Sequence, residues 1–196
     1  SAATASSSIT VNPAATANGG GPYVACGTDP VSIQATASGP GTWSAPAGSG
    51  VFGSATSAGT TFTPASGNGG TITLTWTTAD PDGAGPCGPV SATTTVTVNP
   101  PATALVGGPY TACSNAPVPI EATTNTNGTW STSGAGTFGN GTAAGTTYTP
   151  GAGDANGPVT ITWTTVDPDG SGPCSAATAS STITVTLLQW WTPVRM

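Results

Sequence analysis

Apolar and polar residues alternate along several short stretches of the chain. Residues 71–78 read TITLTWTT, so that isoleucine, leucine and tryptophan alternate with threonine, and residues 159–165, VTITWTT, repeat the pattern. Alternation with a period of two is typical of a β-strand that buries one face. Similar patterns occur in residues 31–37, 59–64 and 93–98. Because no window has the period of an amphipathic helix, the pattern predicts an all-β protein.

Clusters of turn-forming residues separate these stretches. They include the sequences GTDP, GPG, GNGG and DPDGAGP, whose glycine, proline, asparagine and aspartate residues favour turns. Several short strands joined by frequent turns are typical of an antiparallel β-sandwich. We therefore expect Trp76 and Trp163, which alternate with threonine, to lie in the cores of such sandwiches.

The sequence repeats itself with a period of 87 residues. Cys26 recurs as Cys113, and Cys87 recurs as Cys174. Other equivalent pairs are Tyr23 and Tyr110, Trp43 and Trp130, Trp76 and Trp163, Asp80 and Asp167, and Asp82 and Asp169. Between the tryptophans the offset slips by one position, so that Phe62 corresponds to Tyr148, and it recovers where GNGG becomes GDANG. Such a slip is expected in a surface turn.

The last strand of the repeat is present three times, whereas the rest is present twice. Residues 1–11, SAATASSSITV, match residues 175–185, SAATASSTITV, at ten of eleven positions. Residues 1–12 are therefore an extra copy of the last strand. Ile9 and Val11 lie on one face of it, which suits pairing with another sheet.

This extra strand has two interpretations. It is the end of an upstream repeat, or it is a strand that inserts into a neighbouring subunit. Neither repeat visibly lacks a strand. Insertion would therefore require residues 1–12 to displace residues 175–186 of a neighbour, or to pair along a free edge. A head-to-tail contact of this kind generates an open filament.

The four cysteines allow three disulfide pairings. The repeat favours Cys26–Cys87 and Cys113–Cys174, because each unit then closes on itself. By a chain-entropy estimate each such bridge stabilises its unit by roughly 4 kcal/mol. The alternative, Cys87–Cys113, would lock the two units together.

The composition argues against catalysis and against binding to nucleic acid. The 196 residues include one arginine, no lysine and no histidine, against seven acidic residues. The usual bases for a serine or cysteine nucleophile are therefore missing, and so are the clustered cations that nucleic acids and anionic lipids attract. No stretch is long and apolar enough to span a bilayer. Four cysteines in such a chain favour an oxidising, extracellular setting.

The sequence DPDG occurs once in each repeat and is a candidate calcium site. It places Asp80 and Asp82 in the first repeat, and Asp167 and Asp169 in the second. Two carboxylates together with turn carbonyls could hold Ca²⁺, which prefers six to eight oxygen ligands. The simpler interpretation is that Asp80 and Asp167 cap a proline-containing turn.

Aromatic residues outside the alternating pattern are candidates for stacking on sugars. These are Trp43 and Trp130, which follow Gly-Thr, and Tyr23 and Tyr110. A carbohydrate-binding module would expose them, whereas an assembly module would bury its tryptophans.

Two further features concern the surface. Asn127-Gly-Thr and Asn140-Gly-Thr fit the N-glycosylation motif. The C-terminal residues 187–196 depart from the repeat, and the apolar residues Leu187, Leu188, Trp190 and Trp191 form a candidate contact patch there.

Three stretches of the second repeat carry a resemblance to a known type of domain. They are GTWSTSGAGTF (128–138), GTTYTPGAGD (145–154) and VTITWTTVDPDGSGPC (159–174). Together they resemble the immunoglobulin-like or PKD-like repeats of large secreted surface adhesins and filament proteins of Bacteroidetes-type bacteria. The resemblance implies a spacer or adhesive role and supplies no catalytic residues.

We therefore expect two tandem immunoglobulin-like antiparallel β-sandwiches, each with one intradomain disulfide, at residues 13–99 and 100–186. The expected function is that of a non-catalytic, extracellular structural protein of a filament, stalk or adhesin shaft. Its expected partners are copies of itself or neighbouring repeats. A carbohydrate-binding module that recognises surface glycans is the alternative.

Overall fold

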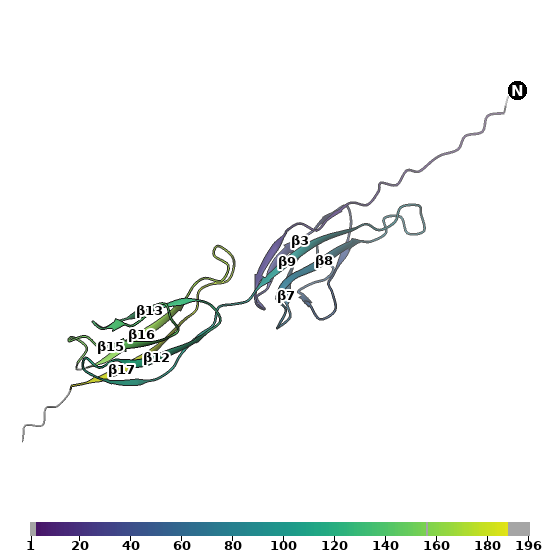
Figure 1. Ribbon diagram of the computed structural model, residues 1–196. Helices are drawn as coiled ribbons and strands as arrows, with labels where there is room; N and C mark the ends of the chain where they lie inside the picture. Colours follow the sequence, from purple (N-terminus) through teal and green to yellow (C-terminus); the bar gives the residue numbers. More distant parts are fainter. Residues whose placement is uncertain (1–2, 156, 188–196) are drawn as a thin grey trace, which may run out of the picture. The chain divides into compact units, whose positions relative to one another are not determined.

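The computed structural model describes residues 3–155 and 157–187 (Figure 1). The chain divides into two compact units, which are unit 1 (Ser1–Pro100) and unit 2 (Pro101–Met196). The described residues form strands and turns and contain no helix. This confirms the prediction of an all-β protein.

Unit 1 is built from short strands that form two main sheets. Its strands are β1 (Ala17–Asn18), β2 (Tyr23–Cys26), β3 (Val31–Gln34), β4 (Thr36–Ala37), β5 (Gly41–Ser44), β6 (Gly50–Phe52), β7 (Gly59–Pro64), β8 (Gly70–Thr78) and β9 (Ser91–Asn99). One sheet has the order β2-β9-β8-β5, the other has the order β3-β7-β6, and β1 pairs with β4. The neighbours are antiparallel, except that β2 lies parallel to β9.

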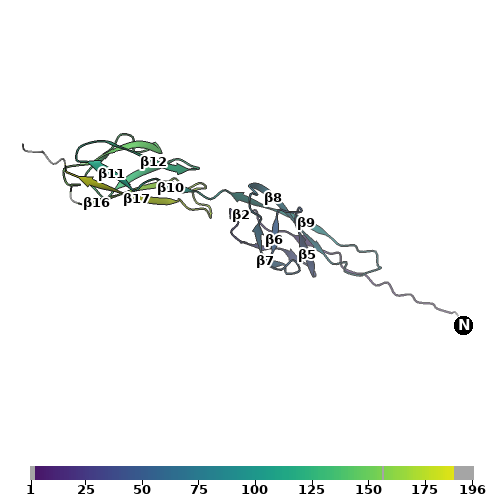
Figure 2. The same cartoon turned by 90° about the horizontal axis from the view of Figure 1, so that it is seen from below.

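Unit 2 repeats this arrangement. Its strands are β10 (Ala104–Val106), β11 (Tyr110–Cys113), β12 (Val118–Thr124), β13 (Gly128–Thr132), β14 (Thr137–Phe138), β15 (Gly145–Thr149), β16 (Pro158–Thr165) and β17 (Thr178–Thr186). The sheet β11-β17-β16-β13 corresponds to the sheet that holds β9, and the sheet β10-β12-β15-β14 covers it. Again one neighbouring pair is parallel, that of β11 and β17 (Figure 2).

The core of each unit lies between its two sheets. In unit 1, Ile33 and Phe62 of the smaller sheet pack with Leu74, Trp76 and Val96 of the larger one. Alternate residues of β8 are buried, as the period of two predicts. In unit 2, the equivalent buried cluster includes Ile120, Tyr148, Ile161, Trp163 and Ile183. Burial of Trp76 and Trp163 confirms their predicted place in the core.

The predicted disulfide pairing is wrong. Cys87 and Cys113 are free, whereas Cys26 and Cys174 are disulfide-bonded. Neither Cys26–Cys87 nor Cys113–Cys174 is therefore formed, and Cys87–Cys113 is not formed either.

Strand length explains why a unit cannot close on itself. Cys26 lies opposite Asn99, the last residue of β9, whereas Cys87 precedes Ser91, the first residue of that strand. Nine residues of strand span about 26 Å at about 3.3 Å per residue. The few residues between Cys87 and Ser91 reach back at most about 14 Å. A disulfide requires Cα atoms within about 7 Å of each other, and unit 2 has the same geometry because Cys113 lies opposite Thr186.

Candidate assembly site

The described part of the extra N-terminal copy, residues 3–12, is not paired with any strand of unit 1. Residues 3–16 form no strand, and Figure 1 shows them leaving unit 1 as an extended segment. Ile9 is 89% exposed and Val11 is 85% exposed. In β17, which has nearly the same sequence, the equivalent Ile183 is fully buried and Val185 is 5% exposed. The same apolar face is therefore open to solvent in one copy and forms part of a core in the other.

The end of this segment is anchored to the loop between β8 and β9. The Asn12 side-chain amide donates a hydrogen bond of 3.0 Å to a carboxylate oxygen of Asp82. The thiol of Cys87 donates to the backbone carbonyl of Asn12, with 3.7 Å between sulfur and oxygen. Asp82 also accepts a hydrogen bond of 3.2 Å from the backbone N–H of Cys87. Asn12, Asp82 and Cys87 thus form one contact, which we call the Asn12 junction.

The charges at the Asn12 junction shift the pKa values of two of its members. The hydrogen bond from the Asn12 side chain lowers the pKa of Asp82 below its ordinary value, because it stabilises the carboxylate. Burial raises the pKa of the Cys87 thiol, and the negative charge of Asp82 raises it further. Cys87 is therefore mainly a neutral thiol at neutral pH.

The DPDG turns use their carboxylates within the loop. A carboxylate oxygen of Asp80 accepts hydrogen bonds from the backbone N–H groups of Asp82 and Gly83, at 3.1 and 3.0 Å. In unit 2, Asp167 accepts the same two bonds from Asp169 and Gly170, both at 3.1 Å. Asp80 and Asp167 thus cap the turn. The described residues contain no group of three or more histidine, cysteine, aspartate or glutamate residues that could hold a metal, and calcium binding at these turns stays a prediction.

The tryptophans proposed for sugar stacking are buried, which contradicts that part of the prediction. Trp43 is 2% exposed and Trp130 is 6% exposed. Each packs edge-on against the core tryptophan of its unit, with ring centroids 5.3 Å apart. Their indole N–H groups donate to the backbone carbonyls of Ala58 and Ala143, at 3.2 and 3.0 Å. Cross-strand pairing with the neighbouring core tryptophan places both rings inside the sandwich.

Tyr23 and Tyr110 also serve the fold. The hydroxyl of Tyr23 accepts a hydrogen bond of 2.9 Å from the backbone N–H of Gln34 and donates one of 3.1 Å to its carbonyl. The hydroxyl of Tyr110 accepts a hydrogen bond of 3.1 Å from the N–H of Glu121. Both phenols therefore bind the backbone of a neighbouring strand.

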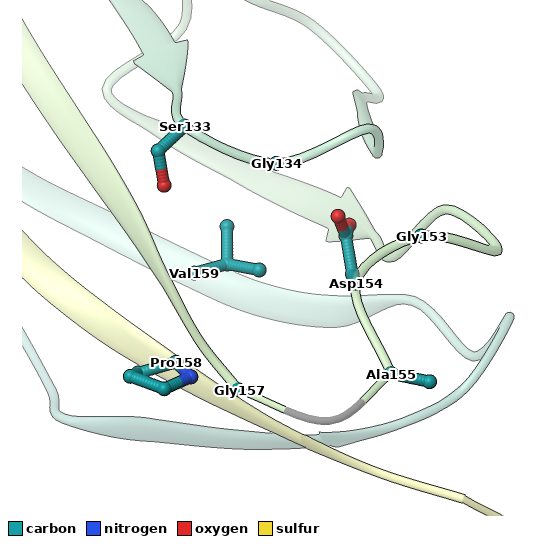
Figure 3. A pocket seen from close by; sticks show the side chains of 8 residues that line it. All are labelled: Ser133, Gly134, Gly153, Asp154, Ala155, Gly157, Pro158 and Val159. Carbon is teal, nitrogen blue, oxygen red and sulfur yellow. The ribbon is translucent and has the colours of Figure 1, made fainter.

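Sequence analysis did not predict the buried polar group that lies in unit 2. Asp154 is 5% exposed and accepts hydrogen bonds from the hydroxyl of Tyr148 and the backbone N–H groups of Ala135 and Gly151, at 2.8, 2.6 and 2.9 Å. It borders an open hollow of about 300 Å³, and Figure 3 shows its carboxylate turned toward the chain at Gly134. The sequence signal was the change from Phe62 to Tyr148 together with the altered GDANG turn.

The remaining predicted positions lie on the surface or outside the described residues. Asn127 and Asn140 are exposed. Their glycosylation stays a prediction. Leu187 is exposed, whereas Leu188, Trp190 and Trp191 lie outside the described residues.

Comparison with known proteins gives the fold. No family model matches the chain, and no curated protein matches it. Among solved structures the chain is similar to the I-band fragment I67–I69 of titin, with 10% identity and a TM-score of 0.50 over 88% of this chain and 65% of that one. The chain thus spans about two thirds of the length of that fragment.

Two other similar structures come from different proteins. A C-terminal fragment of intimin in complex with the intimin-binding domain of its translocated receptor has 16% identity and a TM-score of 0.49, over 92% of this chain and 66% of that one. Extracellular domains 3–5 of Drosophila OTK have 12% identity and a TM-score of 0.47, over 84% and 59%.

The similarity to these structures shows the fold of the chain, which is that of tandem immunoglobulin-like β-sandwiches. No helix among the described residues is long and apolar enough to cross a membrane.

Proposed function

We propose that this chain is a non-catalytic, extracellular structural protein whose β-sandwich repeats build a filament, stalk or adhesin shaft. Successive copies are joined head to tail when residues 1–12 of the next copy take the place of β17 in unit 2 of the copy before it. The observation that carries the proposal is the contrast between Ile9, which is 89% exposed, and Ile183, which is fully buried.

The sequence of the incoming strand fits the site that it would enter. Ile9 and Val11 would occupy the core positions of Ile183 and Val185. The two differences, Ser8 for Thr182 and Asn12 for Thr186, leave the apolar face unchanged. Full burial of an isoleucine or valine side chain stabilises by about 1.5–3 kcal/mol. The exchange replaces a strand with nearly the same strand, so that contacts in the core of unit 2 are retained.

Composition and burial support the rest of the proposal. Disulfide bonds persist in oxidising, extracellular settings, and this chain forms one. The sequence has no histidine and no lysine for acid–base or nucleophilic chemistry. Because Trp43 and Trp130 are buried, they offer no stacking platform for a sugar. A carbohydrate-binding module is therefore the less favoured function.

The proposal is tested by comparing the full chain with a variant that lacks residues 1–12. The core of unit 1 contains no residue of this segment, so the shortened chain is expected to fold. We expect the full chain, kept in reducing agent, to form particles larger than a monomer in light scattering and filaments in negative-stain microscopy. The shortened chain is expected to remain monomeric.

Two substitutions provide a matched pair for the same experiment. Ile9→Asp places a charge at a position that must become buried, and it is expected to abolish assembly. Ser8→Thr makes the segment identical to β17 at that position and is expected to leave assembly intact. Isolated monomers in every sample would refute strand exchange and would favour the interpretation of residues 1–12 as the end of an upstream repeat.

A further inference from the structure

We infer that Cys113 of one copy forms a disulfide with Cys87 of the next copy, so that each head-to-tail junction is locked covalently. The inference rests on the proposed strand exchange and names the bond that would hold it. Exchange of like for like retains the core contacts of unit 2, and a covalent bond would keep the exchanged strand from leaving again.

The two free cysteines provide the first argument. Cys113 ends β11 of unit 2, and Cys87 lies in the loop between β8 and β9 of unit 1. Neither forms a disulfide within its own chain, so each is available to a second copy.

Strand register within unit 2 provides the second argument. Cys113 lies opposite Thr186 on β17, and the residue of the N-terminal segment equivalent to Thr186 is Asn12. When residues 1–12 of a second copy occupy the place of β17, their Asn12 lies beside Cys113. Neighbouring strands are about 4.8 Å apart, which brings the backbone of that Asn12 close to the cysteine.

Contacts within unit 1 complete the geometry. The backbone carbonyl of Asn12 already accepts a hydrogen bond from the thiol of Cys87, at 3.7 Å. Asn12 is thus next to Cys87 of its own copy and would be next to Cys113 of the neighbouring copy. Cys113 is exposed and Cys87 is half-buried, so both thiols are accessible to a partner that docks there.

The chemistry is the oxidation of two thiols by a small-molecule disulfide, such as glutathione disulfide. The thiolate of Cys113 attacks the oxidant, forms a mixed disulfide and releases one small thiol. The thiolate of Cys87 then attacks the sulfur of Cys113 and releases the second small thiol. Two protein thiols are oxidised, one small disulfide is reduced to two thiols, and the protons of the protein thiols are taken up by the released thiolates.

The test uses the full chain with either Cys87→Ser or Cys113→Ser, each treated with glutathione disulfide alone and as an equal mixture. Non-reducing electrophoresis shows the products, and digestion with pepsin followed by mass spectrometry identifies the linked peptides. The peptides that carry the disulfide-bonded Cys26 and Cys174 in the same digest are the internal control for oxidation. The wild-type chain is expected to give a ladder of oligomers.

The mixture is expected to give a dimer that contains one copy of each variant, linked through Cys113 and Cys87. Docking raises the local concentration of the two thiols, so this dimer is expected to be about tenfold or more above the same-cysteine dimers of either variant alone. The linked peptide is expected to disappear when residues 1–12 are removed from the copy that supplies Cys87.

Other outcomes would overturn the inference in distinguishable ways. Filaments in reducing agent without any Cys87–Cys113 peptide after oxidation would refute the lock and leave strand exchange standing. Dimers that link identical cysteines, or a Cys87–Cys113 bond within one copy, would refute the head-to-tail pairing. The same yield without residues 1–12 would refute the role of the strand, and absence of both filaments and linked peptide would refute the proposed function together with the lock.

Discussion

The hydroxyl of Tyr148 donates a hydrogen bond of 2.8 Å to the buried carboxylate of Asp154. Unit 1 has Phe62 and Asn68 at the equivalent positions, and there the Asn68 side-chain amide donates to the carbonyls of Gly48 and Ser49, both at 3.0 Å. The two units therefore fasten the same turn with groups of opposite hydrogen-bonding character.

Asp154→Asn is expected to destabilise unit 2. The carboxylate accepts three hydrogen bonds, and an amide presents N–H groups to some of the same donors. The expected loss is about 1–3 kcal/mol. Hydrogen exchange of β15 and β16 in the full chain measures it, with β7 and β8 of unit 1 as the internal control. Equal protection in wild type and variant would show that the carboxylate contributes nothing to the fold.

The contribution of Asp154 is expected to disappear in acid. Burial opposes ionisation, but the hydrogen bonds from Ala135, Gly151 and Tyr148 outweigh it, so that the pKa of Asp154 lies below its ordinary value. The stabilisation is present above the unfolded pKa of about 4 and is lost as the pH falls through the lower folded pKa. The difference in unfolding free energy between wild type and Asp154→Asn should therefore shrink below about pH 4. A difference that grows in acid would contradict the assignment.

Tyr148→Phe is expected to destabilise unit 2, because it introduces the phenylalanine of unit 1 without the asparagine that accompanies it there. The variant removes the hydroxyl that donates to Asp154 and accepts from the N–H of Gly136, and the expected cost is about 1–3 kcal/mol. Burial raises the pKa of Tyr148, so the wild type is most stable relative to the variant below about pH 10 and loses that advantage as the pH rises further. Urea unfolding of both proteins at neutral and alkaline pH measures this. A variant as stable as wild type at neutral pH would show that the hydroxyl is dispensable.

Ile9 and Ile183 should respond differently to the same substitution. Ile183 is fully buried, so Ile183→Ala is expected to destabilise unit 2 by about 2–5 kcal/mol. Ile9 is exposed in the single chain, and Ile9→Ala is expected to leave the melting temperature of the monomer unchanged. Thermal unfolding of both variants in dilute solution makes the comparison. An equal loss in both would place the N-terminal segment in a core of its own chain.

Asp82→Asn should make Cys87 more reactive. Burial raises the pKa of the thiol and the charge of Asp82 raises it further, so removing that charge increases the thiolate fraction. The rate of alkylation by iodoacetamide at pH 8 is therefore expected to rise. Cys113 serves as the control, since its rate should not change. An unchanged rate at Cys87 would show that burial alone sets the pKa.

The sequence predicted the strands and the core well, because alternation in β8 and β16 reports directly on which face is buried. It also located the extra strand, since identity with β17 needs no structure to be seen. The disulfide was missed for a physical reason. In a tandem repeat, cysteine spacing alone does not say which cysteines pair, and the length of β9 decides against pairing within unit 1.

The polar group in unit 2 was missed for another reason. A single aspartate in a glycine-rich turn is usually solvated, and its burial depends on the loop that carries Ala135, far away in the sequence. The paired changes from Phe62 to Tyr148 and from Asn68 to Asp154 were the available signal. Similarly, the sequence left the burial of Trp43 and Trp130 open because their strands are too short to show alternation. Pairing with the core tryptophans buries them.

The parallel pairing of β2 with β9, and of β11 with β17, has a mechanical consequence. The two strands of a pair run in the same direction. Tension applied between the start of the first strand and the end of its partner therefore slides the two strands along each other. The evenly spaced hydrogen bonds of a parallel pair then share the load and must break together, whereas bonds in a hairpin pulled open from one end break one after another. The backbone hydrogen bonds of the parallel pair would therefore provide the resistance of each unit to stretching. Ion pairs between side chains would add little, since only 4% of the residues are charged.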